Sequence, residues 1–359
     1  FSSHLRFLMK ITLKSYFLII FALLASCSKS ISEKSEDILT IDLTQELTST
    51  TPIVVREISL STGDDDPIGH ISKFVPTKDG FFIMDAFRNT VWKFSETGEI
   101  QGKLHNIGNG PGEYSSVGEI DVYPNGDLAI LDFKTNKIHR YDGLLKFVSS
   151  VEIPGKAINF TIGDSASYFL SKAGDKHEIN MNLGHFNTFD GAIEPILKSK
   201  HKHENLAFGS VTTHFWRSGN DVIFYNRFTP DFYLIRNDSV SPYFSISSDN
   251  IPDNDVVATL IKTTMDHQYS FAGINPATIL DVLYAFRNDD ILLFGLSSTP
   301  QRHICYRFSD NQMFSLNMNT PSFYGALQGA IGVYQGCFVT NKQPLDDGNP
   351  SILLYKFNN

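Results

Sequence analysis

The chain is poor in cysteine, in basic residues and in long hydrophobic runs. It has only 3 cysteines in 359 residues, so disulfides are not its main source of stability. Lys and Arg total 30 against 39 Asp and Glu, which argues against nucleic acid as a partner, because phosphates require a basic surface. The sequence also lacks His-Glu-x-x-His, Gly-x-Ser-x-Gly, phosphate-loop and dinucleotide fingerprints. None of the common sequence signatures of catalysis is therefore present.

The N-terminus has the order of a secretory signal. Lys10 and Lys14 come before the apolar run Tyr16–Leu24, which is shorter than the about 20 apolar residues that a transmembrane helix needs. We therefore predict that residues 1–26 form a signal peptide. Residues 1–8 precede Met9 and read as an upstream extension.

The residues after the apolar run resemble a bacterial lipobox. Leu24-Ala25-Ser26-Cys27 ends on a cysteine, which we predict to be lipidated and to anchor the protein in a membrane. The alternative is a secretory signal without lipidation. Cleavage removes three cations and no acid, so the net charge falls from −9 to −12.

The remaining cysteines, Cys305 and Cys337, could pair in an exported protein. We favour two small apolar core residues unless their strands prove to be adjacent. Residues 28–51 are rich in Ser, Thr, Glu and Asp, and we predict a flexible tether there, as part of a segment 27–51 that begins at the lipidated cysteine.

An internal repeat predicts the fold. Asp79–Asp85 returns 46 to 47 positions later as Asn125–Asp132, and each copy is followed by an aromatic strand. Each repeat reads as four short antiparallel strands, and six such units can be traced, the last of which lacks one strand. The strand predicted at 52–60 would complete it. We predict an all-β fold, a closed six-bladed β-propeller over residues 52–359, rather than a pair of β-sandwiches. One helix is expected in a long insertion at 249–275.

Loop geometry suggests where a ligand would bind. In a propeller, the loops between blades and the loops after the second strands share one rim, where we expect a site. Arg88, Lys134, Lys172 and Arg227 follow second strands and could form a basic collar for an anionic ligand. The alternative is that each pairs with a nearby acid such as Asp85 or Asp132.

Two loops on the same rim add candidate contacts. The glycines of Gly108–Tyr114 expose backbone N–H groups, so Glu113 and Tyr114 are candidate ligand contacts. The alternative is that Tyr114 packs inward and Glu113 caps the amides of its own loop. Tyr269, in the long insertion, is a further candidate.

A metal site has little support in the sequence. His201 and His203 would lie on one face of a strand beside Glu204, but a third ligand would have to come from elsewhere. A solvated loop is the favoured reading. We therefore predict no metal and no cofactor, and keep a divalent cation in the channel only as part of an enzymatic alternative.

The chain resembles the six-bladed β-propeller lipoproteins of Bacteroidetes, a group similar to NHL-repeat propellers. The resemblance rests on the lipobox at Cys27, on Ile58–Thr62 leading to Pro67–Ile71, and on Gly108–Tyr114 with the strand at Asp121. It implies that the protein is displayed in the cell envelope, as an outer-membrane lipoprotein that faces the periplasm or the cell surface. It also implies a binding role without established chemistry.

We accordingly expect a non-catalytic, lipid-anchored propeller that binds a glycan, peptide or protein at the rim around the channel. The alternative is an NHL-like lyase or hydrolase with a rim or channel metal.

Overall fold

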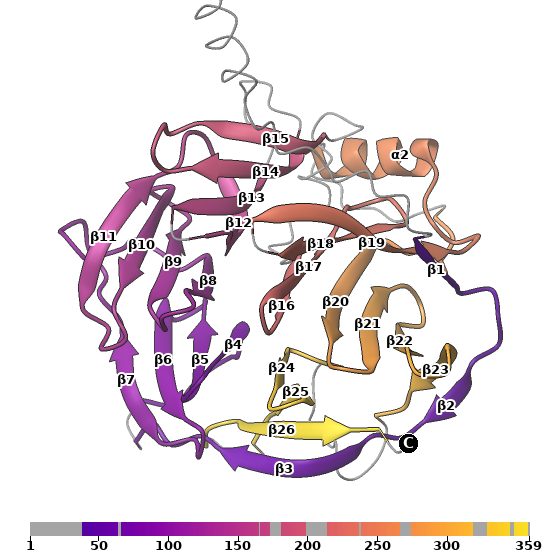
Figure 1. The fold of residues 1–359 in the computed structure, drawn as a ribbon, viewed down its shortest axis with the longest axis horizontal. Coiled ribbons are helices and arrows are strands. Elements are labelled where there is room, and N and C mark those ends of the chain that lie inside the picture. The colour runs from indigo at the N-terminus through magenta and orange to yellow at the C-terminus, as the bar shows by residue number, and fades with distance from the viewer. Residues whose placement is uncertain are drawn as a thin grey trace, which may run out of the picture. The chain divides into compact units, whose positions relative to one another are not determined.

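Six β-sheets stand around a central axis, as the blades of a propeller (Figure 1). This confirms the predicted fold class. The arrangement comes from a computed structural model, in which the described residues are 38–63, 66–164, 166–172, 181–198, 214–236, 238–265, 274–318, 329–344 and 348–357.

The first three blades are formed by consecutive strands, with the first strand nearest the axis. Blade 1 holds β4 (Lys73–Thr77), β5 (Gly80–Asp85), β6 (Thr90–Ser95) and β7 (Ile100–Leu104). Blade 2 holds β8 (Glu119–Val122), β9 (Leu128–Asp132), β10 (Lys137–Tyr141) and β11 (Phe147–Glu152). Blade 3 holds β12 (Ala157–Ile162), β13 (Ser167–Lys172), β14 (Met181–Asn187) and β15 (Ile193–Lys198).

The last three blades each receive a strand from the N-terminal part of the chain. Blade 4 holds β16 (Phe215–Ser218), β17 (Asp221–Tyr225), β18 (Asp231–Arg236) and β19 (Ser239–Ser247). Blade 5 holds β20 (Asp281–Arg287), β21 (Ile291–Ser297), β22 (Arg302–Arg307) and β23 (Gln312–Leu316). Blade 6 holds β24 (Gly332–Tyr334), β25 (Cys337–Lys342) and β26 (Ser351–Lys356).

Strand β3 (Ile53–Ser59) closes the ring. It pairs antiparallel with β26 as the outer strand of blade 6 and then leads into β4 of blade 1. The strand predicted at 52–60 thus completes the unit that lacked one. Closure removes an exposed edge that would otherwise be available for pairing with another chain.

The tether prediction is wrong for its C-terminal part. Strand β1 (Leu39–Asp42) pairs parallel with β19, and β2 (Thr48–Thr50) pairs parallel with β23. Both lie on the outer edge of the ring (Figure 1). Two apolar side chains explain this, because Ile41 and Leu43 are buried in the same hydrophobic cluster as residues of blades 4 and 5. We call residues 38–50 the N-terminal arm.

The sheets are held by apolar side chains between neighbouring blades. Every residue of β5 and of β9 is buried, since a second strand lies between two strands of its own sheet and two neighbouring blades. Cys305 and Cys337 are buried and free, as the preferred reading predicted.

The aspartates that end the second strands of blades 1 and 2, Asp85 and Asp132, have a structural role. Asp85 at the end of β5 accepts hydrogen bonds from the amides of Gly69 and His70. Asp132, its counterpart in blade 2, accepts them from the Ser115 amide and the Ser116 hydroxyl. Each aspartate therefore fixes the loop that leads into its own blade.

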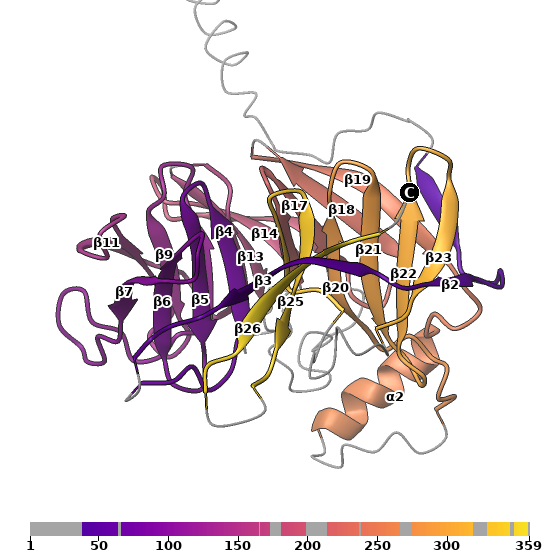
Figure 2. The ribbon, with the colours of Figure 1, turned by 90° about the horizontal axis from the view of Figure 1, so that it is seen from below.

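The two faces of the ring differ in their loops. One face carries the loops between blades and the loops between second and third strands, and we call it the insertion face. The opposite face carries the hairpins between first and second strands and is called the hairpin face. Helix α2 (Asn254–Met265), in the predicted insertion at 249–275, lies on the insertion face (Figure 2). Among the described residues, no helix is long and apolar enough to cross a membrane.

Candidate functional site

A cavity of about 930 Å³ opens on the hairpin face, and we call it the basin. This is opposite to the rim where the sequence predicted a site. Blades 1, 2, 3, 4 and 6 contribute to its walls through the hairpins between their first and second strands, and blades 1, 2 and 4 also through those between their third and fourth strands. Its size is in the range of small-molecule and oligomer sites in proteins.

The hairpins around the basin are short and therefore well defined. Thr77 pairs with Gly80, Ser218 with Asp221, and Tyr334 with Cys337, so only two residues turn the chain in each case. The Gln335-Gly336 turn has a positive φ at both residues, as a type I′ hairpin turn requires. A rigid rim reduces the entropy lost when a ligand binds.

Charged side chains occupy two walls of the basin. Blade 1 contributes two cations and two acids, and blade 4 contributes two cations and one acid, whereas the hairpins of blades 2, 3 and 6 contribute uncharged residues. The charged set is Lys78, Asp79, Lys93 and Glu96 from blade 1, with Arg217, Arg236 and Asp238 from blade 4.

Arg217 lies between the basin and the axis of the ring and lines the cavities on both sides. Its Nε and Nη2 bind Oδ1 and Oδ2 of Asp121 at 2.8 and 2.6 Å. Thr161 also donates to Asp121, at 2.7 Å. Burial alone would raise the pKa of Asp121, but the charge and hydrogen bonds of Arg217 hold that pKa below its ordinary value. The carboxylate is therefore ionised and fixes the guanidinium.

A second cavity, of about 60 Å³, lies among the inner strands next to this pair. Lys73 lies 3.1 Å from Glu119 and donates to the carbonyl of Phe215 at 3.4 Å. These contacts bring β4, β8 and β16 together at the axis beside the basin floor.

Tyr334 forms part of the basin wall in blade 6. The residue is only 5% exposed, and its buried hydroxyl lies beside the side chains of Glu96 and Gln335. Burial raises the pKa of Tyr334 to about 12, with a further contribution from the charge of Glu96. The hydroxyl thus remains a neutral donor at any physiological pH.

A serine, a histidine and an aspartate meet close to the basin, but not as a hydrolytic triad. Ser167 Oγ donates to Asp238 Oδ1 at 2.7 Å, and His185 Nε2 lies 3.1 Å from the same oxygen. In a triad the imidazole accepts the serine proton. Here the serine hydroxyl is directed to the acid instead, so the arrangement holds loops of blades 3 and 4 together.

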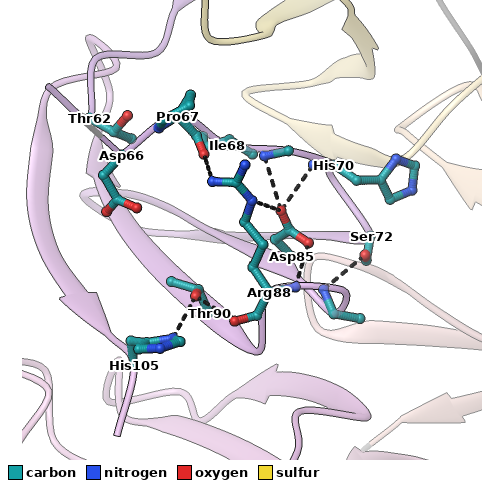
Figure 3. Close-up of polar contacts among 12 residues, drawn as sticks. Thr62, Asp66, Pro67, Ile68, His70, Ser72, Asp85, Arg88, Thr90 and His105 are labelled. Carbon is teal, nitrogen blue, oxygen red and sulfur yellow. Dashed lines mark hydrogen bonds and ion pairs between the residues drawn. The ribbon is translucent and has the colours of Figure 1, made fainter. Parts of the chain in front are cut away.

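Arg88, the first member of the predicted collar, is a loop clamp (Figure 3). It donates to the carbonyl of Pro67 at 2.6 Å, and its Nε lies 4.0 Å from Asp85. The alternative of pairing with Asp85 therefore describes it better. Its side chain is still 46% exposed.

Arg227 is not on the rim surface. It is 3% exposed and lies 2.7 Å from Asp281, which also lies 3.2 Å from His214. Phe228 packs against Val257 and Leu260 of α2. The helix therefore covers this position, and Arg227 is part of a buried ion pair that a rim ligand does not reach.

Lys134 is exposed and lines a shallow hollow of about 480 Å³ on the insertion face, with Phe133 and Lys156. Lys156 lies over the Phe133 ring, 4.3 Å from its centroid. The side chain of Lys172 lies outside the described residues. The structure thus does not bring the three described collar cations together: Lys134 is exposed, Arg88 holds a loop and Arg227 is buried.

The glycine-rich loop is satisfied internally. Glu113 accepts a hydrogen bond from the Gly110 amide at 2.8 Å. Tyr114 is fully buried and donates to the carbonyls of Asn89 and Leu104 in blade 1. Both observations match the alternative reading, in which Tyr114 is an anchor and Glu113 caps its own loop.

Four predicted residues lie outside the described residues: Cys27, His201, His203 and Tyr269. Within the described part of the chain, no group of three or more His, Cys, Asp or Glu side chains could hold a metal ion.

The sequence analysis missed the basin and its floor. Arg217 follows two aromatic residues in the inner strand Phe215–Ser218, and Asp121 lies between Ile120 and Val122 in the inner strand Glu119–Val122. Ionisable residues in buried strands are expected to be paired or functional. That signal could have located the floor of the site, although not the hairpins around it.

Together, the six sheets and the closure of the ring by β3 define an all-β, six-bladed β-propeller. More specifically, the chain belongs to the family described as "Domain of unknown function (DUF4934)", whose model matches residues 42–343. No curated protein matches the sequence.

Solved structures share the fold at low identity. A Bacteroides fragilis protein described as a "putative exported protein" is 13% identical, with a TM-score of 0.67 over 88% of this chain and 100% of its own. A DUF4221 family member from Bacteroides vulgatus is 11% identical, with a TM-score of 0.56 over 88% of this chain and 100% of its own. Virginiamycin B lyase from Staphylococcus aureus is 12% identical, with a TM-score of 0.45 over 84% of this chain and 98% of its own, too distant to support an activity.

Proposed function

We propose that this protein is an exported, lipid-anchored propeller that binds a ligand in the basin without transforming it. The observation that carries the proposal is the basin itself: a cavity of about 930 Å³, walled by short hairpins, over a guanidinium fixed by an ionised carboxylate. Pre-formed concave sites with a few fixed polar groups are typical of ligand binding. The proposal moves the site from the predicted rim to the hairpin face.

Gly143 offers a way to block the basin. It lines the cavity, and an added Cβ would meet no atom within 4 Å. Gly143→Trp should therefore fill the basin without disturbing the fold. Lys134→Trp on the insertion face is the matched control, since Lys134 is exposed and belonged to the predicted rim site.

Binding is measured by calorimetry on the purified protein with a panel of neutral oligosaccharides, acidic oligosaccharides and decapeptides. For any probe that binds, we expect Gly143→Trp to abolish binding and Lys134→Trp to leave the dissociation constant unchanged. The reverse pattern would place the site on the rim and contradict the basin. Absence of binding to every probe would overturn the binding function.

The location is part of the same proposal. The exported description of the Bacteroides fragilis neighbour supports an envelope location, and the lipobox residues Leu24–Cys27 support an acyl anchor. Metabolic labelling with radioactive palmitate tests it: label is expected on the protein and is expected to be lost in Cys27→Ala, which should leave the membrane fraction. Label retained by Cys27→Ala would contradict the anchor.

A further inference from the structure

The glycine-rich loop between blades 1 and 2 contains Asn109-Gly110, one of two Asn-Gly pairs in the sequence. The other, Asn125-Gly126, lies in the turn between β8 and β9. In such a pair the backbone nitrogen of the glycine can attack the side-chain amide carbon of the asparagine and close a five-membered succinimide ring. Glycine favours this reaction, because it has no Cβ to hinder the approach and its backbone adopts many conformations. Each pair is therefore a candidate site of self-modification.

Glu113 lies on the nitrogen that would attack. The Gly110 amide donates a hydrogen bond to Oε2 of Glu113 at 2.8 Å. The carboxylate lies inside the loop, because a Cβ added at Gly108 would clash with Oε2 and one added at Gly110 would lie 3.1 Å from it. A base in this position can accept the amide proton and make the nitrogen a better nucleophile.

A hydroxyl lies beside the group that would be attacked. Ser115 Oγ is 3.5 Å from Oδ1 of Asn109 and donates to it. Negative charge develops on this oxygen when the nitrogen adds to the side-chain carbon, so a nearby donor stabilises that stage. Asn109 and Gly110 are both exposed, so water reaches the reacting atoms. The loop thus places a base, an electrophile and a hydrogen-bond donor together.

The second pair is held differently. The Gly126 amide donates to the carbonyl of Tyr123 at 2.8 Å, and the Asp127 amide donates to Oδ1 of Asn125 at 3.2 Å. A carboxylate can take up a proton, whereas a backbone carbonyl only accepts a hydrogen bond. The turn also fixes the Asn125 side chain through its own backbone. Asn125 is therefore an internal reference with the same dipeptide sequence.

We propose that Asn109 is a self-modification site, converted to aspartate and isoaspartate by its own loop with Glu113 as the base. The Gly110 nitrogen gives its proton to Glu113 and forms a bond to the side-chain carbon of Asn109. The bond from that carbon to the amide nitrogen breaks, and the nitrogen leaves as ammonia with the proton from Glu113. Water then adds to either carbonyl of the succinimide and opens the ring. Only water is consumed, and nothing is oxidised or reduced.

The modification weakens the contact between blades 1 and 2. Both products add a carboxylate to a loop that already holds one, and isoaspartate also lengthens the main chain by one methylene. In the same loop, Tyr114 donates to the carbonyls of Asn89 and Leu104 in blade 1. The Gly112 carbonyl accepts a hydrogen bond from Tyr141 of blade 2 at 3.1 Å. A strained loop holds these contacts less firmly, so the aged protein should melt at a lower temperature than the fresh protein.

Incubation of the purified protein at neutral pH in isotope-labelled water tests the proposal. Peptide mapping by mass spectrometry then measures, at each Asn-Gly pair, the acid that has taken up solvent oxygen. We expect Asn109 to convert about tenfold faster than Asn125, because only Asn109 has a positioned base. The difference should disappear in urea, where the fold no longer holds Glu113 against Gly110.

Glu113→Gln is the diagnostic variant, because its side-chain amide can still accept the Gly110 hydrogen bond but cannot take up the proton. We expect the conversion of Asn109 to slow roughly tenfold, a small part of the about 10²–10⁴-fold that positioned bases contribute in enzymes. Glu99→Gln is the matched control. It removes an exposed carboxylate of blade 1 outside this loop, so it should leave the rate unchanged.

Ser115→Ala provides an independent check, because it removes the donor to Asn109 and leaves Glu113 in place. Faster conversion at Asn109 than at Asn125, slowed by Glu113→Gln and by Ser115→Ala but not by Glu99→Gln, supports the proposal. Equal rates at the two pairs in the folded protein would overturn the modification site. No slowing in either loop variant would overturn the assigned chemistry.

Discussion

Arg217 and Asp121 form a two-point ion pair between inner strands that are not neighbours in the ring. Arg217 belongs to β16 of blade 4 and Asp121 to β8 of blade 2, and their bonds of 2.8 and 2.6 Å pass the inner strand of blade 3. The pair ties the walls of the basin together at its floor, so its loss should affect the whole ring.

Arg217→Ala should destabilise the protein strongly. It leaves the buried carboxylate of Asp121 without its cation, and breaking a buried pair in this way costs about 3–5 kcal/mol. Urea unfolding followed by fluorescence measures the loss. Arg236→Ala is the control, because Arg236 is 51% exposed in its pair with Asp221 and such pairs contribute at most about 1 kcal/mol. Equal losses in the two variants would argue against a structural role for the floor.

Gly112→Ala should destabilise more than Gly126→Ala. Both glycines have positive φ, 75° and 88°, so both substitutions carry a backbone cost of roughly 1–2 kcal/mol. Only at Gly112 would the new Cβ also lie 2.7 Å from the Cβ of Phe147, and overpacking adds about 1–3 kcal/mol. Thermal unfolding of the two variants measures the difference. Equal melting temperatures would show that the glycine-rich loop moves freely away from β11.

Stability should fall as the pH drops below about 6.5, the ordinary pKa of histidine. Burial lowers the pKa of His139, and neither ring nitrogen has a partner among the described residues. Between the lowered pKa and 6.5 the unfolded chain binds the proton more readily, so protonation favours unfolding there. Above that window the imidazole is neutral in the folded and the unfolded chain, so it does not make the free energy of unfolding depend on pH.

His139→Leu should reduce this pH dependence of the free energy of unfolding, measured by urea titrations between pH 7.5 and 5.5. One histidine contributes at most about 1.4 kcal/mol per pH unit. A residual slope is expected from His303, whose pKa burial also lowers. A variant as pH-sensitive as the parent would contradict the assignment to His139.

The N-terminal arm should contribute to stability through Ile41. Its side chain is 1% exposed in the cluster of blades 4 and 5, so Ile41→Ala should cost about 2–5 kcal/mol. The neighbouring Thr40 is exposed, and Thr40→Ala should change stability little. Chemical unfolding of both variants distinguishes a docked arm from a tether, which would make the two substitutions equally harmless.

The fold could be predicted because the strands and turns of each repeat are encoded by residues close together in the sequence. Asp85 and Asp132 end buried strands, and the turns between strands carry glycine, asparagine and aspartate, so blade number and closure followed from counting units. The arm was missed because only Ile41 and Leu43 distinguish it from a polar linker. Its pairing with β19 and β23 depends on partners more than 200 residues away.

The site was harder to predict, because it exists only when hairpins of five blades meet. Lys78-Asp79 and Gln335-Gly336 have the sequences of ordinary turns. The binding site was predicted on the insertion face because long loops are often functional. Arg227 was predicted to be an exposed loop cation, because no residue near it in the sequence indicates that α2 covers it. For Tyr114 and Glu113, the sequence allowed both a ligand contact and a structural role. The burial of Tyr114 and the hydrogen bond from the Gly110 amide to Glu113 favour the structural role.

The N-terminal arm and β3 also set the order in which the ring can be finished. Thr40 meets Ser245, Ser315 meets Thr48, and Lys342 meets Glu57, at sequence separations of 205, 267 and 285 residues. A ribosome releases these early residues long before their partners in blades 4, 5 and 6. The first strands made must therefore wait unpaired for the last three blades, so ring closure is a late and slow step of folding. A truncated chain that lacks those blades would display its arm and β3 as free strands, which makes incomplete molecules easy for a protease to distinguish from finished ones.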